Sequence, residues 1–187
     1  MATPRPPAPA LLVVAAFSRH EDALVTARGE LERSFGPVAL THEPFAFDQT
    51  AYYEPTMGPG LCKQLWAFHD LLAPDRLPEL KHHTNALESA VAASGAYPDA
   101  RPINLDPGYL LLGKFVLATT KDQAHRLYLR DGIYAEVTLH YHAGAFHPWE
   151  WTYADYRLPE VLAFLERART FYRGRLASDR RPADPLS

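Results

Sequence analysis

Residues 131–142, DGIYAEVTLHYH, alternate between apolar and polar side chains almost to the end of the stretch. The odd-numbered positions from Ile133 to Tyr141 are apolar. The even-numbered positions carry Tyr134, Glu136, Thr138, His140 and His142. Because successive side chains of a strand point to opposite faces, the pattern predicts a β-strand with one buried and one polar face. That polar face is either the wetted side of an antiparallel sheet or the wall of a binding site.

The preceding residues, HRLYLR at 125–130, predict a second strand, which Asp131-Gly132 joins to the first in a tight hairpin. A three-residue loop, Arg130–Gly132, with glycine in the left-handed conformation would set Tyr128 opposite Tyr134 and Arg126 opposite Glu136. A strict two-residue turn would place these rows on opposite faces. The first arrangement is favoured because it also groups the apolar side chains of the two strands.

The start of the chain predicts a strand, a helix and a second strand. ALLVVAAF, residues 10–17, is a continuous apolar run of the kind found in a central strand covered on both faces. Ser18 and Glu21 form a capping box that begins a helix ending near Gly36. Residues 37–47 resume an extended pattern, and a right-handed crossover is expected if the two strands are parallel.

The middle of the chain predicts two helices, followed by the strands of the sheet. LCKQLWAFHDLL, residues 61–72, has apolar residues at helical spacing, which makes Cys62 a buried helical thiol. A second helix is predicted over residues 78–94 and a last one around residues 161–172. The predicted fold class is α+β: a mixed, mainly antiparallel sheet of about five or six strands with helices packed on one face.

The chain has 187 residues, a formal net charge of −3, and hydrophobic and charged fractions of 47% and 22%, which are typical of one globular domain. We expect a flexible leader over residues 1–9, a single domain over 10–176 and a disordered tail over 177–187. The charge argues against a nucleic-acid-coating surface. The start lacks the features of a signal peptide, and no apolar run is long enough to span a membrane, so a cytoplasmic protein is expected.

Polar residues elsewhere in the chain supply further candidates for a site. Lys81, Asn85 and Glu88 of KHHTNALE are spaced to form one stripe of their helix, and a solvated helix face is the alternative interpretation. Asp106 precedes a Pro-Gly turn that by itself explains an aspartate there. The remaining candidates are Lys121, His125 and Arg126 at a basic corner, and Trp151, Tyr153 and Asp155 in the aromatic loop WEWTYADY. Trp151 and Tyr153 are suited to wall a pocket.

Several stretches resemble the blocks of an uncharacterised bacterial family, domain of unknown function 4416. They are FDQTAYYEPTMG, LKHHTNALE, INLDPGYL, LATTKDQAHRLYLRDGIYAEVTL and WTYADY. The family has no established reaction; some members are labelled GTP-binding protein, whereas this chain has no G-x-x-x-x-G-K-[ST] loop. The matched positions whose side chains could take part in binding or catalysis are Tyr53, Glu54, Lys81, Asn85, Glu88, Asp106, Lys121, His125, Arg126, Tyr128, Tyr134, Glu136, Asp155 and Tyr156.

Three hypotheses for function follow from these residues. The leading one is a protein that binds or acts on a phosphorylated or nucleotide-like small molecule. In it, Lys81, Lys121 and Arg126 hold anionic groups, and Glu136 with Asp106 or His125 acts as the acid/base pair. The ligand-contacting set is Lys81, Asn85, Glu88, Lys121, Arg126, Tyr128, Tyr134, Trp151 and Asp155.

The second hypothesis is a metal-dependent hydrolase that uses His140 and His142, which lie roughly 7 Å apart at strand rise. His147 or Asp106 would complete its ligand set, because Glu136 is too far along the strand. The third is a protein-interaction module that uses the aromatic loops, residues 50–60 and 147–156. No pattern names a cofactor.

Overall fold

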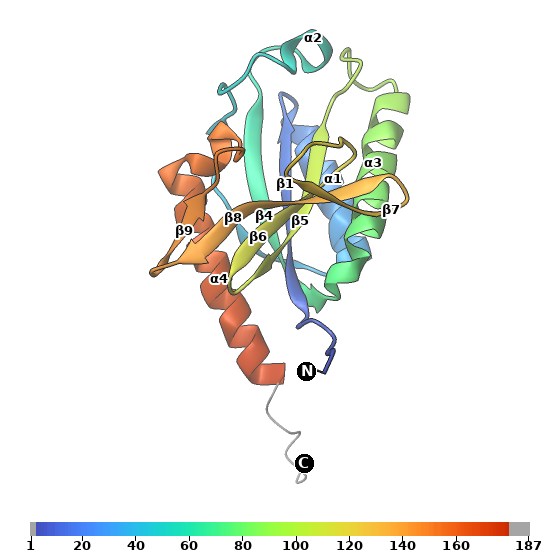
Figure 1. The fold of residues 1–187 in the computed structure, drawn as a ribbon. Helices are drawn as coiled ribbons and strands as arrows, with labels where there is room; N and C mark the ends of the chain where they lie inside the picture. The colour runs from blue at the N-terminus through green and yellow to red at the C-terminus, as the bar shows by residue number, and fades with distance from the viewer. Residues whose placement is uncertain (1–2, 180–187) are drawn as a thin grey trace.

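The structure is a computed structural model, and it describes residues 3–179. A nine-stranded antiparallel sheet forms its centre (Figure 1). The strands are β1 Ala10–Ser18, β2 Val38–Thr41, β3 Phe45–Ala46, β4 Cys62–Leu72, β5 Asn104–Leu111, β6 Lys114–Thr119, β7 Arg126–Arg130, β8 Ile133–His142 and β9 Ala145–Pro148. Their order is β2-β4-β1-β5-β6-β8-β7, with β3 beside β4 and β9 beside β8. The helices are α1 Glu21–Phe35, α2 Glu54–Met57, α3 Leu77–Ala93 and α4 Pro159–Asp179, with short 3-10 turns η1 Pro74–Arg76 and η2 Ala154–Arg157.

The α+β class, the mainly antiparallel sheet and the opening strand-helix-strand unit are confirmed. Two details differ: the sheet has nine strands rather than five or six, and helices cover both of its faces rather than one. Leu12, Val14 and Ala16 of β1 pack in a cluster with α1 and α3, whereas the alternate residues Leu11 and Val13 pack with α4 (Figure 1). An unbroken apolar run is therefore what a strand at this position requires.

The opening unit encloses another strand. β1 and β2 both pair antiparallel with β4, so they run in the same direction with β4 between them. The helix predicted over residues 61–72 is wrong, because these residues form β4, and Cys62 is half-buried at the start of that strand. Leu65 packs on the α4 side and Trp66 on the α1 side. A strand buried on both faces shows no period of two, so its apolar spacing can be mistaken for helical spacing.

The predicted pairing of the β7–β8 hairpin is confirmed, with Arg126 opposite Glu136 and Tyr128 opposite Tyr134. The route differs. Arg130 pairs with Ile133 across a two-residue turn in which Asp131 and Gly132 have φ of 54° and 75°, and a bulge between Tyr128 and Arg130 restores the register. Leu127 and Tyr128 are exposed, because β7 is the edge of the sheet.

The row of polar residues along β8 changes face within the strand. Phe115 and Val116 of β6 are adjacent, yet they pair with Leu139 and Val137, so β8 contains one extra residue, Thr138. Val137 packs with the α1–α3 cluster and Leu139 with the α4 cluster. The expectation that His140 and His142 share a face with Glu136 is therefore wrong, since a bulge reverses the alternation.

β5 and β6 separate from each other and form a fork in the sheet. They pair only between Gly108–Leu111 and Lys114–Leu117. Residues 104–107 of β5, which precede Gly108, still pair with β1 but not with β6. Ala118 and Thr119 at the end of β6 pair with β8 but not with β5. Hydrogen-bonding groups on the inner edges of the fork therefore need other partners.

Replacing Gly108 with alanine is expected to lower the free energy of unfolding by about 1–3 kcal/mol, because a Cβ there would overlap the carbonyl oxygen of Val116 at the base of the fork. Urea titration measures the change. Gly113→Ala is the matched control, since nothing lies within 4 Å of its added Cβ. Equal stabilities of the two variants would contradict the expected close approach.

The predicted leader and tail lie only partly within the described residues. α4 continues to Asp179 and so includes residues 177–179, which we assigned to the tail; the remaining tail, residues 180–187, lies outside the described residues. Residues 3–9 of the leader have no helix or strand, and residues 1–2 lie outside the description. Among residues 3–179 no helix is both long and apolar enough to cross a membrane.

Candidate functional site

A cavity of about 590 Å³ lies at the fork between β5 and β6. Its walls come from β1, the loop before α2, β4, α3, β5, β6, β7, β8 and η2. Seven residues of the predicted acid/base and ligand-contacting sets line it: Lys81, Asn85, Asp106, Lys121, Arg126, Glu136 and Asp155. The fold thus brings together residues that are up to 74 positions apart in the chain, from Lys81 to Asp155. The further candidates Tyr53, Tyr153 and Tyr156 line the cavity as well.

Helix α3 provides the missing partners for the inner edge of β5. The Lys81 ammonium donates to the carbonyl oxygen of Leu105 at 3.0 Å, and the Leu105 N–H donates to Glu88 at 2.7 Å. These are the backbone groups that β6 would pair with if the strands had stayed together. The stripe of Lys81, Asn85 and Glu88 therefore faces the fork. Lys81 and Asn85 line the cavity, whereas Glu88, a predicted ligand contact, does not.

Asp106 lies at the centre of a polar network on β5. It accepts hydrogen bonds from Lys81 at 3.1 Å and from Asn104 at 2.7 Å. Arg101 donates to Asn104 and, at 3.1 Å, to Glu88. Burial by itself would raise the pKa of Asp106, but Lys81 and the nearby Lys63 outweigh it and lower the pKa. At Glu88 burial dominates, so the pKa of that carboxyl is raised.

The lowered pKa of Asp106 predicts a pH dependence of stability. The ionised carboxylate stabilises the fold above its unfolded pKa of about 3.9, and this contribution is lost as the pH falls through the lower folded pKa. Asp106→Asn should lower the free energy of unfolding by about 1 kcal/mol at pH 7 and flatten its decline below pH ~4. Urea titrations from pH 2 to pH 7 test this, with Asp122→Asn as the exposed control. A wild-type slope retained in Asp106→Asn would contradict it.

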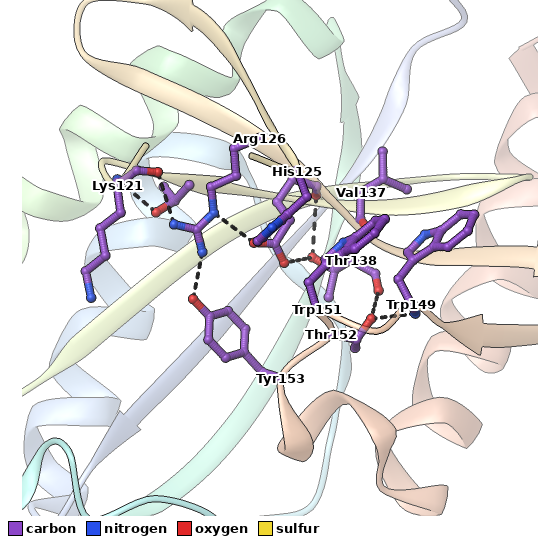
Figure 2. Close-up of polar contacts among 11 residues, drawn as sticks. Lys121, His125, Arg126, Val137, Thr138, Trp149, Trp151, Thr152 and Tyr153 are labelled. Carbon is purple, nitrogen blue, oxygen red and sulfur yellow. Dashed lines mark hydrogen bonds and ion pairs between the residues drawn. The ribbon is translucent and has the colours of Figure 1, made fainter. Parts of the chain in front are cut away.

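The predicted Arg126–Glu136 pair is formed and buried, and Figure 2 shows Arg126 with its other partners, Lys121 and Tyr153. The Arg126 Nε donates to Glu136 Oε2 at 2.9 Å, and His125 Nε2 lies 3.1 Å from the same oxygen. Two further Arg126 donors reach the carbonyl oxygen of Lys121 at 3.0 Å and the Tyr153 hydroxyl at 2.8 Å. Arg126 thus ties together the loop before β7, the strand β8 and the segment before η2.

His125 lies behind Glu136 and is not part of the cavity wall. Its ring stacks on Trp151 with centroids 5.1 Å apart, and Trp151 stacks in turn on Trp149 at 5.2 Å. The Trp151 indole N–H donates to the carbonyl oxygen of Val137 at 3.1 Å (Figure 2). Trp151 therefore packs on His125, which in turn contacts Glu136, and it does not line the cavity.

Four other predicted residues also lie away from the cavity. Tyr128 and Tyr134 pack edge to face, 5.3 Å apart, on the outer hairpin. The ring of His140 lies 4.2 Å from that of Trp149, and His142 is exposed at the end of β8. Within residues 3–179 no group of three or more His, Cys, Asp or Glu side chains is arranged to hold a metal ion, so the His140–His142 hypothesis gains no third ligand.

The inner end of the cavity contains a buried ion pair that sequence analysis missed. The Lys63 ammonium lies 2.5 Å from Asp155 Oδ2, and both side chains are buried. The centroids of the Phe17, Phe47 and Tyr156 rings lie 4.6–5.4 Å from the same ammonium. With residues 61–72 taken as a strand, the alternation would have put Lys63 on the same face as Leu65. A lysine on a buried strand face is a signal of a charged partner.

The cavity wall carries more basic than acidic groups. Five basic side chains, Lys63, Lys81, Arg101, Lys121 and Arg126, line it together with the three carboxylates Asp106, Glu136 and Asp155. Arg101 and Lys63 are additions to the predicted set. Among the described residues Lys121 has no carboxylate within ion-pair distance, and its ammonium lies 4.9 Å from the centroid of the exposed Tyr52 ring.

A comparison with models of known protein families finds a match that covers most of the chain. The model of a domain of unknown function (DUF4416) matches residues 8–172. The chain belongs to the DUF4416 family. The match spans β1 through most of α4 and includes every element that lines the cavity. Searches among curated proteins and among solved structures find no match. The activity of this DUF4416 protein has therefore to be inferred from its cavity.

Proposed function

We propose that this DUF4416 protein binds a small anionic molecule, phosphorylated or nucleotide-like, in the cavity at the fork of the sheet. The observation that supports this most directly is the excess of basic groups on an aromatic-walled cavity of about 590 Å³, a size typical of small-molecule sites. No membrane or nucleic-acid partner enters the proposal, and we place the protein in the cytoplasm.

The anionic group would bind at the mouth of the cavity, where Lys121 and the hydroxyls of Thr119 and Thr120 are close in sequence and line the wall. Lys81 and Arg126 already donate to carboxylates and backbone carbonyls. Those two cations therefore contribute mainly to the positive potential, while the Lys121 ammonium retains the donors that a phosphate needs.

Chemistry at the site would use the carboxylates on the wall. Glu136 faces the cavity beside Arg126, and Asp106 faces it from β5. His125 reaches Glu136 from behind, which suits it to hold that carboxylate rather than to contact the ligand. The acid/base pair in this proposal is therefore Glu136 and Asp106, and binding is the part that is tested first.

Binding is tested by thermal unfolding with millimolar uridine 5′-monophosphate, adenosine 5′-monophosphate, ribose 5-phosphate or inorganic phosphate. At least one compound should raise the unfolding temperature, because a ligand that binds only the folded state stabilises it by mass action. Lys121→Ala should reduce that shift, whereas Lys114→Ala, an exposed lysine outside the cavity wall, should leave it unchanged. The absence of any shift across the four compounds would count against the proposal.

The hypothesis of a protein-interaction module is less favoured by the same geometry. Tyr52 and Tyr153 are exposed, yet both line the cavity. Trp149 and Trp151 stack on each other, Trp151 also stacks on His125, and the ring of Trp149 lies tilted against that of His140. The positions of these aromatic side chains are thus explained by the cavity wall and by the stack beside the Glu136 pair, without a protein partner.

A further inference from the structure

The inner end of the cavity offers hydrogen-bond donors that the described chain does not use. Within residues 3–179 the Lys63 ammonium has one hydrogen-bond acceptor, Asp155, although it carries three donors. The Tyr156 hydroxyl is buried and has no hydrogen-bond partner among these residues. A buried polar group without a partner costs folding free energy, so two adjacent groups with spare donors are a feature that a bound molecule would explain.

Flat aromatic side chains surround these donors. The ring of Phe17 lies 4.6 Å from that of Phe47 and 4.8 Å from that of Tyr53. Phe17 and Phe47 are buried together with Met57 and Leu61, so their ring positions are set by packing. Together with Tyr156, these rings line the inner end of the cavity, and the half-buried Tyr53 presents the accessible ring surface against which a planar group can stack or pack edge to face.

The charges differ between the two ends of the cavity. At the inner end Lys63 is neutralised by Asp155 at 2.5 Å. A second anion there would have to be desolvated beside the Asp155 carboxylate, whereas a neutral oxygen can accept from the spare donors at little cost. At the mouth, Lys121 is exposed and unpaired among the described residues. A charged group is therefore favoured at the mouth and a neutral acceptor inside.

We propose that Lys63, Tyr156 and the rings of Phe17, Phe47 and Tyr53 form a subsite for a planar ring that carries a carbonyl oxygen. This rests on the proposed function, because the anionic group of the same ligand would lie at Lys121. The proposed ligand is thus an anionic molecule with a neutral ring that carries a carbonyl oxygen. Its ring lies at the inner end of the cavity, and its anionic group lies at the mouth. Tyr156 is the specificity-determining residue, since its hydroxyl donates to the ring oxygen.

The protonation states of the two tyrosines agree with a donor role. Burial, with the negative charge of Asp155 as the next cause, raises the pKa of Tyr156 well above its ordinary value. Burial and the nearby Asp106 likewise raise the pKa of Tyr53. Both hydroxyls therefore stay protonated throughout the neutral and mildly alkaline range and remain able to donate.

The test compares three probes by calorimetry or ligand-observed NMR: uridine 5′-monophosphate, which has a ring with two carbonyl oxygens; phenyl phosphate, which has a ring without one; and ribose 5-phosphate, which has no planar ring. The wild-type chain should bind uridine 5′-monophosphate most tightly. Tyr156→Phe should weaken that binding about tenfold, the loss expected for one hydrogen bond, and change phenyl phosphate binding less than twofold.

Stability measurements separate this role from a structural one. Because the Tyr156 hydroxyl has no partner in the described chain, Tyr156→Phe without ligand should unfold at the same temperature as the wild type or higher. Tyr109→Phe, which alters a tyrosine packed on the opposite face of the sheet, is the control and should leave binding unchanged. A Tyr156→Phe variant that binds uridine 5′-monophosphate within twofold of the wild type would overturn the subsite.

The two proposals fail in different ways. If the wild-type chain binds uridine 5′-monophosphate and phenyl phosphate equally well and Tyr156→Phe changes neither, the cavity is an anion site without the ring subsite. If the wild type binds none of the three probes, the subsite is wrong. The proposed function is then also wrong if adenosine 5′-monophosphate and inorganic phosphate fail to raise the unfolding temperature.

Discussion

Glu136→Ala is expected to lower the free energy of unfolding by about 3–5 kcal/mol, one of the two largest effects we foresee for a single substitution in this chain. The side chains of Arg126 and Glu136 are only 1% and 2% exposed. Removing the carboxylate leaves a buried cation without its partner, and that loss is far costlier than the net stabilisation that an ion pair provides. Urea titration followed by tryptophan fluorescence measures the change.

The double variant Arg126→Met/Glu136→Leu distinguishes this cause from a simple packing loss. Replacing both charges with apolar side chains of similar length removes the unpaired cation, so most of the lost stability should return. Glu79, which is exposed and paired with Arg76 and Arg130, provides a surface comparison, and Glu79→Ala should leave the free energy of unfolding nearly unchanged. A double variant as unstable as Glu136→Ala would show that the unpaired charge is not the reason.

Lys63→Met should cause a loss of similar size, about 3–5 kcal/mol, because it leaves the Asp155 carboxylate buried without its cation. The methionine keeps most of the aliphatic chain, so the contacts with Phe17 and Phe47 are largely preserved and the effect reports on the charge. The same urea titration at pH 7 measures it.

Asp155→Asn in the Lys63→Met background is the matching control. It removes the charge while retaining the shape of the side chain, so stability should recover by a large part of the loss. A Lys63→Met chain as stable as the wild type would mean that Asp155 is solvated, which would contradict the closed inner end of the cavity.

The parts of the fold that could be predicted from the sequence are those that neighbouring residues determine. The β7–β8 hairpin was predicted with its correct pairs, Arg126 with Glu136 and Tyr128 with Tyr134, because a turn dipeptide and an alternating pattern act over a few residues. Helix α1 and the central strand β1 were predicted for the same reason. The loop that joins the hairpin was not, since a bulge in β7 compensates for the shorter turn. The predicted Ser18–Glu21 capping box is wrong, because the helix begins at Glu21 after His20 and no side chain caps it, while the Ser18 hydroxyl donates to the carbonyl oxygen of Pro102.

The candidate site was predicted in part. Lys81, Asn85, Asp106, Arg126 and Glu136 were selected as polar residues in predicted regular elements or at their ends, and all five line the cavity. Lys63 was missed because β4 was taken for a helix. Trp151 and His125 were expected near the ligand, but they lie behind the Glu136 pair, a position that depends on how the loop after β9 folds back.

By itself the sequence determined the α+β class, the antiparallel hairpin and the collection of charged side chains that had to be buried or bound somewhere. Only the tertiary structure decided that β5 and β6 separate beyond Gly108, that α3 inserts Lys81 and Glu88 where β6 would have paired, and that a cavity results. The physical reason is that strand partners and helix contacts are non-local. The free energy of a hydrogen bond or a buried charge depends on groups that the local pattern of residues does not specify.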